Sequence, residues 1–409
     1  MLASHDVLVI GGGLVGASLA IALEGLGLGV GLVDTSADGA LPAVFDQRNL
    51  SLADASVNAL TALGVLPLLR APTGPIRRIH ASRRGDLGRV VLDAAEQGQE
   101  AFGQVVVARD LGEALEARLA QLPGLVRHRP CRFVTLPHMA ADAGERRVVL
   151  ERDGSSLTLG ARLVVAADGS RSAVRAALAI NADEHDYRQT LLVARLRTAR
   201  PPDGTAYERL CDDGPTALLP RGDRHYGMVH AVAVEDADAV RALDDAAFIA
   251  RVQQAFGWRA GRMLSVGERS AYPAFSLTAR TTVAPRAVLV GNAAQTLHPI
   301  GAQGFNLGLR DAMTLADVLA PCIGAADVDP GDAARLARHV ALRREDREQT
   351  VALSHGLARL GSSPGALLSP LRSLGLLALA ADPGLRARLA GGAMGYRGQV
   401  PTRCRAPAR

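Results

Sequence analysis

The feature that most constrains the fold is a glycine-rich turn between an apolar segment and a helical segment near the N-terminus. Residues 5–10 have the pattern of a buried strand, and Gly11, Gly13 and Gly16 follow with the spacing Gly-x-Gly-x-x-Gly at the start of a helix. The first glycine makes the tight turn, the second lets the backbone approach a pyrophosphate, and the third lets the helix pack on the strand. The helix N-terminus offers its N–H groups to the phosphates. This stretch predicts a parallel α/β sheet that binds a dinucleotide.

A second predicted strand, residues 29–33, ends at Asp34, about 20 residues beyond the glycines. A carboxylate at this place meets a ribose hydroxyl in dinucleotide-binding folds. The alternative is a tight turn with no ligand, but strand, helix, second strand and acid in register favour the dinucleotide. NAD and FAD both satisfy this geometry, so the N-terminal region leaves the choice between them open.

Two further strand-to-helix junctions lie downstream. One predicted strand ends at Asp168-Gly169, and another ends at Gly291 before a loop that contains Gly301 and Gly304. By itself, the Asp-Gly pair is more typical of an ordinary turn whose aspartate caps the next helix. Because all three junctions lead from a strand into a helix, their loops can gather on one edge of a parallel sheet.

Two arginines are candidates for contact with a cofactor phosphate. Arg48 precedes a helix that we expect to begin at Ser51, with Asp54 in a capping-box-like position. Arg109 follows a predicted strand and opens a helix, where a cation opposes the helix dipole by roughly 0.3–1 kcal/mol. That cost is explained if Arg109 faces an anion, but a solvated arginine beside Asp110 fits equally well.

Composition argues against several classes of protein. The net charge is +5, but all 46 basic residues are arginine, they are spread along the chain, and aromatic residues make up 3%. Nucleic-acid binding needs a basic stripe or a stacking platform, so we expect no nucleic-acid partner. Four cysteines without a Cys-x-x-Cys pair argue against a metal site and a disulfide framework. With no long apolar run and no basic leader, we expect a cytoplasmic protein.

Taken together, the three junctions resemble those of the group A flavoprotein monooxygenases with the para-hydroxybenzoate hydroxylase fold. Within that group, the chain is similar to the FAD-dependent hydroxylases of ubiquinone biosynthesis, in particular those acting on 2-polyprenyl-6-methoxyphenol. The resemblance runs from about residue 5 to about residue 398. The segments that carry it are Gly291–Ile300, Gln303–Asp311, Gly214–Pro220 and Ala393–Gly395.

The resemblance implies an α/β architecture with three parts and a tail. A Rossmann-like FAD-binding domain with a parallel sheet is expected over residues 1–75, 100–182 and 276–335. An inserted substrate domain with a mixed or antiparallel sheet is expected over residues 76–99 and 183–275. C-terminal helices are expected over residues 336–398, and the composition of residues 399–409 predicts a disordered tail.

By the same resemblance, FAD lies against the three junctions. The implied cofactor contacts are Gly11, Gly13, Gly16, Asp34, Arg48, Arg109, Val134, Asp168, Gly169, Gly291, Asn292, Pro299, Gln303, Gly304, Phe305 and Asn306. Two positions depart from the wider family. Asn292 stands where most relatives have aspartate, and Gly301-Ala302 replaces Ala-Gly, which places a Cβ where the loop approaches the flavin.

The implied reaction is hydroxylation of a phenol. NAD(P)H reduces FAD, O2 adds to form a flavin hydroperoxide, and the phenol takes the distal oxygen. The sequence has no second Gly-x-Gly-x-x-Gly motif, so NAD(P)H is expected to dock transiently. His298 is the candidate base, although a histidine before proline in a loop is more often structural. No other base is identified.

The apolar segment 367–381 leaves the partners open. It could lie on the inner membrane to receive a polyprenylphenol, making the protein peripheral there. It could equally pack within the protein, in a homo-oligomer, or against other ubiquinone-biosynthesis proteins. Two alternative functions also remain: a hydroxylase of a small soluble phenol, and a non-catalytic FAD-binding subunit of a quinone-synthesis complex.

Overall fold

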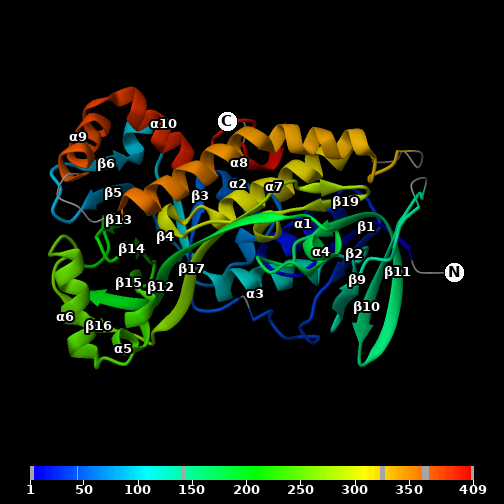
Figure 1. Ribbon diagram of the computed structural model, residues 1–409, viewed down its shortest axis with the longest axis horizontal. Coiled ribbons are helices and arrows are strands. Elements are labelled where there is room, and N and C mark those ends of the chain that lie inside the picture. The colour runs from blue at the N-terminus through cyan, green and yellow to red at the C-terminus, as the bar shows by residue number, and fades with distance from the viewer. Residues whose placement is uncertain (1–3, 44, 141–142, 323–327, 362–367, 407–409) are drawn as a thin grey trace.

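The computed structural model describes residues 4–43, 45–140, 143–322, 328–361 and 368–406. The parts of the expected domains, C-terminal helices and tail at 1–3, 44, 141–142, 323–327, 362–367 and 407–409 lie outside the described residues. The described residues form three sheets. The two large sheets lie side by side, and a long C-terminal helix crosses both of them (Figure 1).

The first large sheet has eight strands in the order β18-β19-β11-β1-β2-β8, with β10 and β9 added on β11. Its strands are β1 (Ser4–Ile10), β2 (Val30–Val33), β8 (Val126–His128), β9 (Arg132–Thr135), β10 (Arg146–Arg152), β11 (Ser155–Ala166), β18 (Val283–Ala284) and β19 (Ala287–Leu289). The four pairings β19-β11, β11-β1, β1-β2 and β2-β8 are parallel. This confirms the expected parallel α/β sheet.

The register of this sheet gathers the three predicted junctions. Ile10 lies opposite both Ala166 and Val33, and Ala166 lies opposite Leu289. The strands therefore end at one level, and the turns that follow them share one edge. Apolar side chains of β1, β2, β11 and β19 pack in one core with the helices that cover this face. These helices are α1 (Leu14–Glu24), α2 (Asp54–Ala62), α3 (Ala108–Leu119) and α7 (Gly304–Leu319).

The second large sheet is mixed, as expected. It has nine strands in the order β20-β17-β12-β15-β14-β13-β5-β6, with β16 on β12. They are β5 (Arg78–Arg83), β6 (Arg89–Asp93), β12 (Ala182–Thr198), β13 (Thr205–Leu210), β14 (Thr216–Pro220), β15 (Tyr226–Ala233), β16 (Met263–Val266), β17 (Ser270–Ala279) and β20 (Gln295–Thr296). The pair β13-β5 is parallel and the other printed pairs are antiparallel. Helices α5 (Ala237–Arg241) and α6 (Asp245–Phe256) pack against it.

A small third sheet corrects one expectation. Strands β3 (Asn49–Ala53), β4 (Gly74–Pro75) and β7 (Gly103–Val107) form it, and α2 begins directly after β3. Ser51 therefore lies in a strand and does not begin the helix. The predicted capping box is therefore wrong: the N-cap residue of α2 is Ala53. The Ala53 N–H donates to Asn306 Oδ1 at 2.8 Å, so a residue distant in sequence caps the helix.

The C-terminal region contains α8 (Ala333–Gly361), α9 (Leu368–Ala381) and α10 (Pro383–Ala393). The disorder expected after residue 399 is not found up to residue 406. Cys404 is fully buried, its carbonyl accepts a hydrogen bond from Asn58 at 3.4 Å, and the Thr402 N–H donates to Asp317 at 2.7 Å. A buried thiol and two tertiary hydrogen bonds offset the entropy of ordering a segment that looks polar in isolation.

Shorter elements connect these parts. Helix α4 (Ala173–Ala177) follows β11, and 3-10 helices lie at Leu66–Leu68, Ala94–Gln97, Val234–Asp236, Gly291–Ala293, Ile300–Ala302, Ala320–Cys322 and Thr402–Cys404. Among the described residues, no helix combines the length and the apolar run needed to cross a bilayer.

Candidate cofactor and substrate site

The glycine turn after β1 is built for close approach. Gly11 has a φ of 112°, and a Cβ there would lie 2.4 Å from the carbonyl oxygen of Ala167. A Cβ on Gly16 would lie 1.9 Å from the oxygen of Gly11. Gly13 is the N-cap of α1 and gives it no side-chain cap, and the first turn of the helix contains no acid. Its first N–H groups are therefore available to an anion such as a pyrophosphate.

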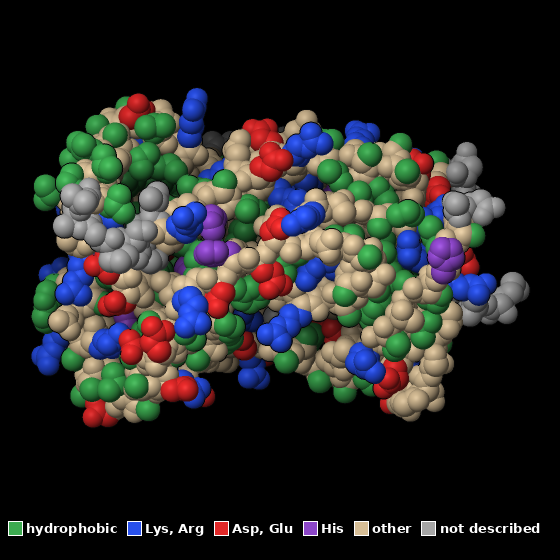
Figure 2. All heavy atoms as spheres, in the orientation of Figure 1, with side chains coloured by type: hydrophobic (Ala, Val, Ile, Leu, Met, Phe, Trp, Pro, Cys, Tyr) green, Lys and Arg blue, Asp and Glu red, His purple; other side chains and the backbone are tan. Residues whose placement is uncertain are grey.

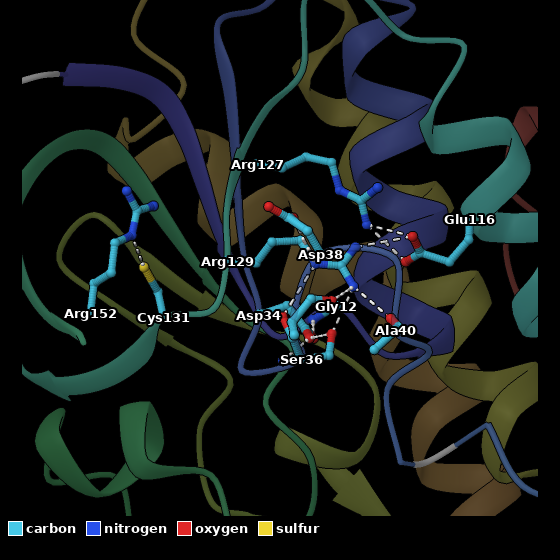
Figure 3. Close-up of polar contacts among 11 residues, drawn as sticks. Gly12, Asp34, Ser36, Asp38, Ala40, Glu116, Arg127, Arg129, Cys131 and Arg152 are labelled. Carbon is cyan, nitrogen blue, oxygen red and sulfur yellow. Dashed lines mark hydrogen bonds and ion pairs between the residues drawn. The ribbon is translucent and has the colours of Figure 1, made fainter. Parts of the chain in front are cut away.

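Asp34 directly follows β2 and is held in place by neighbours (Figure 3). Its Oδ2 accepts the Gly12 N–H at 2.9 Å, and its Oδ1 accepts the Ser36 N–H at 2.7 Å and the Ser36 hydroxyl. Arg129 donates to Ser36 Oγ at 2.9 Å and to Glu116 at 3.0 Å. Sequence reasoning missed Arg129, because an isolated arginine after a short strand carries no signal of its own.

The second junction places an unsatisfied carboxylate oxygen next to the glycine turn. Asp168 Oδ2 accepts the Val174 N–H at 3.1 Å, but its Oδ1 is buried and has no hydrogen-bond partner within the described part of the chain. Arg175, also missed from the sequence, donates to Ser170 O at 2.8 Å and to Ala293 O at 2.9 Å. It thereby ties the second junction to the third. Gly169 has a φ of 88°, which glycine adopts without strain.

The third junction begins at Gly291, whose N–H donates to Asp311 Oδ2 at 3.3 Å. Asn292 is exposed beside it, and Pro299 is exposed farther along the loop. Gly301 and Ala302 both have positive φ, 71° and 51°. A left-handed alanine costs roughly 1–2 kcal/mol, so the departure noted in the sequence is a real strain in the loop.

The start of α7 completes the arrangement. Gln303 is its N-cap and gives it no side-chain cap; its Nε2 donates to Gly301 O at 3.2 Å, while its Oε1 is buried and without a partner among the described residues. Gly304 and Phe305 follow and are half-buried. Two helix N-termini and two orphaned oxygens thus belong to junctions on one sheet edge. Phosphates suit the helix starts, and ribityl and flavin donors suit the oxygens, so these residues fit FAD.

Asn306 has an internal role that the sequence did not indicate. Its Oδ1 accepts Ala53 N–H and Ser56 Oγ–H, both at 2.8 Å. Its Nδ2 donates to Ser51 O at 2.8 Å and Ala302 O at 2.9 Å. Every hydrogen-bonding position of this buried amide is used, so we propose that Asn306 locks the loop and caps α2.

Replacing Asn306 with alanine should lower the free energy of unfolding by about 2–4 kcal/mol, because buried groups in two segments lose their partners. Replacing the exposed Asn292 with alanine should leave stability within ~0.5 kcal/mol and weaken FAD binding. Urea unfolding of both apoproteins and flavin fluorescence titration measure the two effects. A stability loss equal in the two variants would contradict the role given to Asn306.

Both candidate arginines donate a hydrogen bond to Asp46, Arg48 through its side chain and Arg109 through its backbone N–H. Arg48 Nε donates to Asp46 Oδ1 at 2.9 Å, and the guanidinium lies 4.7 Å from the centre of the Tyr272 ring. Tyr272 donates its hydroxyl to Asp46 Oδ2 at 2.8 Å, which joins this loop to β17 of the second sheet. The Arg109 N–H donates to Asp46 O at 2.8 Å, while its exposed side chain pairs with Glu113 at 3.3 Å. Their roles toward FAD remain proposals.

Val134 lies on β9 and is exposed. The segment is tied to the second strand end, because Cys131 donates its N–H to Asp34 O at 2.8 Å. That link places β9 on the side of Asp34, where we propose that the adenosine part of FAD binds.

His298 is a structural residue in this geometry. Its Nδ1 accepts the Ile300 N–H at 3.2 Å, so Nε2 carries the proton and faces Gln189 Oε1 at 3.4 Å. Its ring stands edge-on to Tyr187 at 4.7 Å between centroids. Burial lowers the pKa of His298 to about 4, so the ring is neutral at pH 7. With both nitrogens engaged in holding the loop, we do not propose His298 as the base.

Glu208 is a titratable residue that sequence reasoning overlooked. It lies on β13, opposite Ala217 and Ala81 on the two neighbouring strands. Burial raises the pKa of Glu208 to about 7, and the N–H of Gly301, which faces the carboxylate, partly opposes that rise. The second sheet therefore meets the loop of the third junction through this side chain. Glu208 stands between Tyr207 and Arg209 in β13, and this local pattern gives no sequence signal of such a contact.

The raised pKa of Glu208 predicts a pH effect on stability. The folded state binds the proton more tightly than the unfolded chain, so this residue's contribution is full below its ordinary value of 4.5 and declines up to about pH 7. Glu208→Gln should remove that decline, so its stability relative to the parent should improve as pH rises through this window. Urea unfolding at several pH values measures it. A constant difference from pH 4.5 to 8 would count against the assignment.

The parallel sheet and the cradle at its edge fit an FAD-binding protein, and the similarity to known proteins makes it an FAD-dependent monooxygenase. The chain belongs to the family described as FAD binding domain, whose model matches residues 4–345. It is 35% identical over 381 residues to ubiquinone hydroxylase UbiL of Rhodospirillum rubrum, and this alignment covers 91% of the chain and 85% of UbiL. It is 30% identical over 321 residues to 3-demethoxyubiquinol 3-hydroxylase of Escherichia coli, covering 77% and 79%.

Solved structures agree on the fold. The p-nitrophenol 4-monooxygenase PnpA of Pseudomonas putida DLL-E4 superposes with a TM-score of 0.77 at 17% identity, covering 98% of this chain and 100% of that one. PqsL of Pseudomonas aeruginosa superposes with a TM-score of 0.74 at 22% identity, covering 92% and 100%. FAD is the cofactor, and NAD(P)H and O2 are the co-substrates standard for this family of aromatic hydroxylases.

Proposed function

We propose that this protein hydroxylates a polyprenylphenol intermediate of ubiquinone biosynthesis. The observation that carries the proposal is the match over 91% of the chain to a protein named ubiquinone hydroxylase UbiL and over 77% to a 3-demethoxyubiquinol 3-hydroxylase, combined with a cradle that fits FAD. Helix α9 packs on the sheet that would carry the substrate site. Leu376 and Leu379 of α9 lie against a buried core cluster that includes Ala206 on β13 and Leu92 on β6.

The residues of the cradle have separate proposed tasks. Gly11, Gly13 and Gly16 with the start of α1 hold the pyrophosphate, and Asp34 holds the adenosine ribose. Asp168 and Asn292 bind the ribityl chain, and the start of α7 places a positive dipole end toward the pyrimidine edge. When bound, FAD supplies the transfer of oxygen from O2 at the expense of NAD(P)H. The protein orients the ring of the phenol and excludes water.

We further propose peripheral contact with the inner membrane from the cytoplasmic side. The leucine face, defined as Leu87, Leu368, Leu371, Leu374 and Leu377, has exposed fractions from 39% to 75%. Four of these residues recur at every third position of α9, so consecutive leucines are neighbours on the helix surface, and the run winds about halfway round the helix. Figure 2 shows hydrophobic side chains gathered over α9 and α10 at the upper left. Apolar patches on this scale mark membrane or partner contacts.

A buried ion pair fixes the leucine face to the substrate sheet. Arg372 Nε donates to Asp86 Oδ2 at 2.7 Å, and Ser369 donates to Asp86 Oδ1 at 2.7 Å. The Leu87 N–H donates to Ser373 Oγ at 2.9 Å, so the β5–β6 turn moves with α9. The leucine face is therefore held rigidly against the β5–β6 turn, which suits contact with a bilayer.

Replacing Leu371 and Leu374 together with serine should weaken binding of the holoenzyme to anionic phospholipid vesicles by about tenfold or more, since each leucine contributes roughly 1.5 kcal/mol or more when buried. Leu264→Ser, at an exposed leucine on β16, is the matched control and should bind as the parent does. Vesicle co-sedimentation measures both. If all three proteins sediment alike, or if the parent stays in solution, membrane contact through this face is wrong.

The function is tested by deleting the gene in the source organism and profiling lipid extracts by mass spectrometry. Loss of ubiquinone, with build-up of an intermediate one hydroxyl short, is expected and names the ring position. An unchanged ubiquinone pool would overturn the proposal and favour a small soluble phenol. NAD(P)H oxidation by the purified protein without any hydroxylated product would favour the non-catalytic subunit.

A further inference from the structure

A cavity of about 200 Å³ lies beside α8, apart from the proposed FAD contacts. One wall is α8, and the others are the β17–β18 turn, the segment after β19 and the middle of α7. The charged and titratable residues that line it include Arg280, Asp311, His339, Arg343, Arg344 and Arg347. None of them is among the residues proposed to hold FAD, and the assigned reaction uses none of them.

Two buried side-chain nitrogens that line the cavity have no hydrogen-bond partner among the described residues. Arg343 is nine-tenths buried or more; its Nε donates to Asp311 Oδ1 at 2.9 Å and its Nη2 to Asp346 Oδ2 at 2.7 Å. Its Nη1 is buried without a hydrogen-bond partner in the part of the chain that the structure describes. The same holds for Nδ1 of His339, which is equally buried. An unmade hydrogen bond from a buried guanidinium is costly, so this nitrogen needs a partner, either water or a bound ligand.

The charges around the cavity are unbalanced. Of the four guanidinium groups that line it, that of Arg280 pairs with Asp183 at 2.8 Å and that of Arg343 pairs with Asp311 and Asp346. Arg344 and Arg347 then stand against one further lining carboxylate, that of Glu348. Arg347 donates to neutral oxygens, Gln295 Oε1 at 2.9 Å and Ala279 O at 2.6 Å. Arg344 is exposed at the rim. Figure 2 shows basic side chains along α8 on the viewed face. The excess of positive charge in a partly enclosed space favours an anion.

The acid on the floor does not oppose an anion strongly. Asp311 accepts hydrogen bonds from Arg343, from Gln295 Nε2 at 2.6 Å and from the Gly291 N–H at 3.3 Å. Both of its oxygens are therefore occupied, and its charge is compensated by the guanidinium it contacts. The groups that can still bind a charged ligand are therefore guanidinium groups of the lining arginines.

We propose that this cavity binds a small oxyanion, a phosphate or a carboxylate, through Arg343, Arg344 and Arg347. The volume corresponds to about six or seven waters at roughly 30 Å³ each, which is enough for such a group with its hydration. Water alone would satisfy the hydrogen bonds but would leave the excess charge. Oxyanions form charge-assisted, often bidentate bonds with guanidinium groups, so they satisfy both.

The test is titration calorimetry on the holoenzyme with inorganic phosphate and, separately, citrate, at constant ionic strength set with chloride. Saturable binding of one of them is expected, and the two arms distinguish phosphate from carboxylate. Arg344→Gln should weaken that binding by about tenfold, because one charge-assisted contact is lost. Arg338→Gln is the matched control: an exposed arginine on the same helix that does not line the cavity. It should change the affinity less than twofold.

A third variant tests the location without changing charge. Val340 lines the cavity, and Val340→Phe should fill part of it and abolish binding. Absence of saturable heat with both anions in the parent protein would show that the cavity holds water and would overturn the proposal. So would equal losses in the Arg344 and Arg338 variants, or unchanged affinity in Val340→Phe, since the anion would then be attracted generally or bound elsewhere.

Discussion

Replacing Asp346 with alanine is expected to lower the free energy of unfolding by about 3–5 kcal/mol, the largest stability effect that we expect from a single polar residue of this chain. Asp346 is fully buried on α8. It accepts hydrogen bonds from Arg310 at 2.6 Å and 3.1 Å and from Arg343 at 2.7 Å. Its removal leaves two guanidinium groups in the interior with fewer carboxylates than they need.

The pKa of Asp346 supports measurement at neutral pH. Burial alone would raise that pKa, but the two arginines outweigh it and hold the pKa below its ordinary value of 3.8. The stabilising contribution is therefore complete above the unfolded value, about pH 4, and is lost only as pH falls through the lower folded value. Urea unfolding followed by circular dichroism at pH 7 records the full effect.

Asp238→Ala provides the control for Asp346. Asp238 pairs with Arg241 on the surface at 3.3 Å, and its side chain is 96% exposed. Such pairs contribute about 0–1 kcal/mol, so the control should stay close to the parent. A loss below 1 kcal/mol for Asp346→Ala would mean that the arginines find other partners or water, and the buried network would not be essential.

Replacing Gly11 with alanine is expected to weaken FAD binding by about 100-fold or more. The φ of 112° is one that residues with a side chain rarely adopt, and the added Cβ would lie 2.4 Å from Ala167 O and 2.9 Å from Asp168 Cα. The alanine would add backbone strain of about 1–3 kcal/mol. The clash is relieved only if the glycine turn moves away from the loop that contains Asp168. Both belong to the proposed cradle, so the cofactor loses contacts at two junctions together.

Gly27→Ala separates backbone strain from the clash. Gly27 has a φ of 69°, also positive, but an added Cβ there meets no described atom within 4 Å. This variant should lose about 1 kcal/mol of stability and keep the parent's affinity for FAD. Flavin fluorescence titration of the refolded apoproteins measures both affinities. An affinity for Gly11→Ala within threefold of the parent would refute the placement of FAD at this turn.

The residues that could be predicted to form the cradle are those whose signal is local. The strand, glycine and helix at Gly11, the acid at Asp34 and the strand end at Gly291 are each defined by a short stretch. Apolar spacing determines the strand, and a φ that only glycine takes freely determines the turn. Parallel pairing then follows, because consecutive strands joined by a helix can share one sheet edge. The observed register bears this out.

Other roles depended on contacts between distant residues. The predicted helix start at Ser51 was wrong because α2 is capped by Asn306, and the ordered segment after residue 399 rests on the burial of Cys404. Arg129 and Glu208 were missed for the same reason. Each lies in a local pattern with nothing unusual, and its partner comes from another sheet or loop.

The sequence by itself thus determined the fold class, the dinucleotide motif and the family, since these depend on residue type and spacing along the chain. Only the tertiary structure decided which polar groups hold one another and which are left for a ligand. Asn306 proved to be internally satisfied, while Asp168 Oδ1 and Gln303 Oε1 were left without partners among the described residues. The physical reason is that hydrogen bonding and burial are settled by which groups meet in space, and the pairings that matter here join segments far apart in the chain.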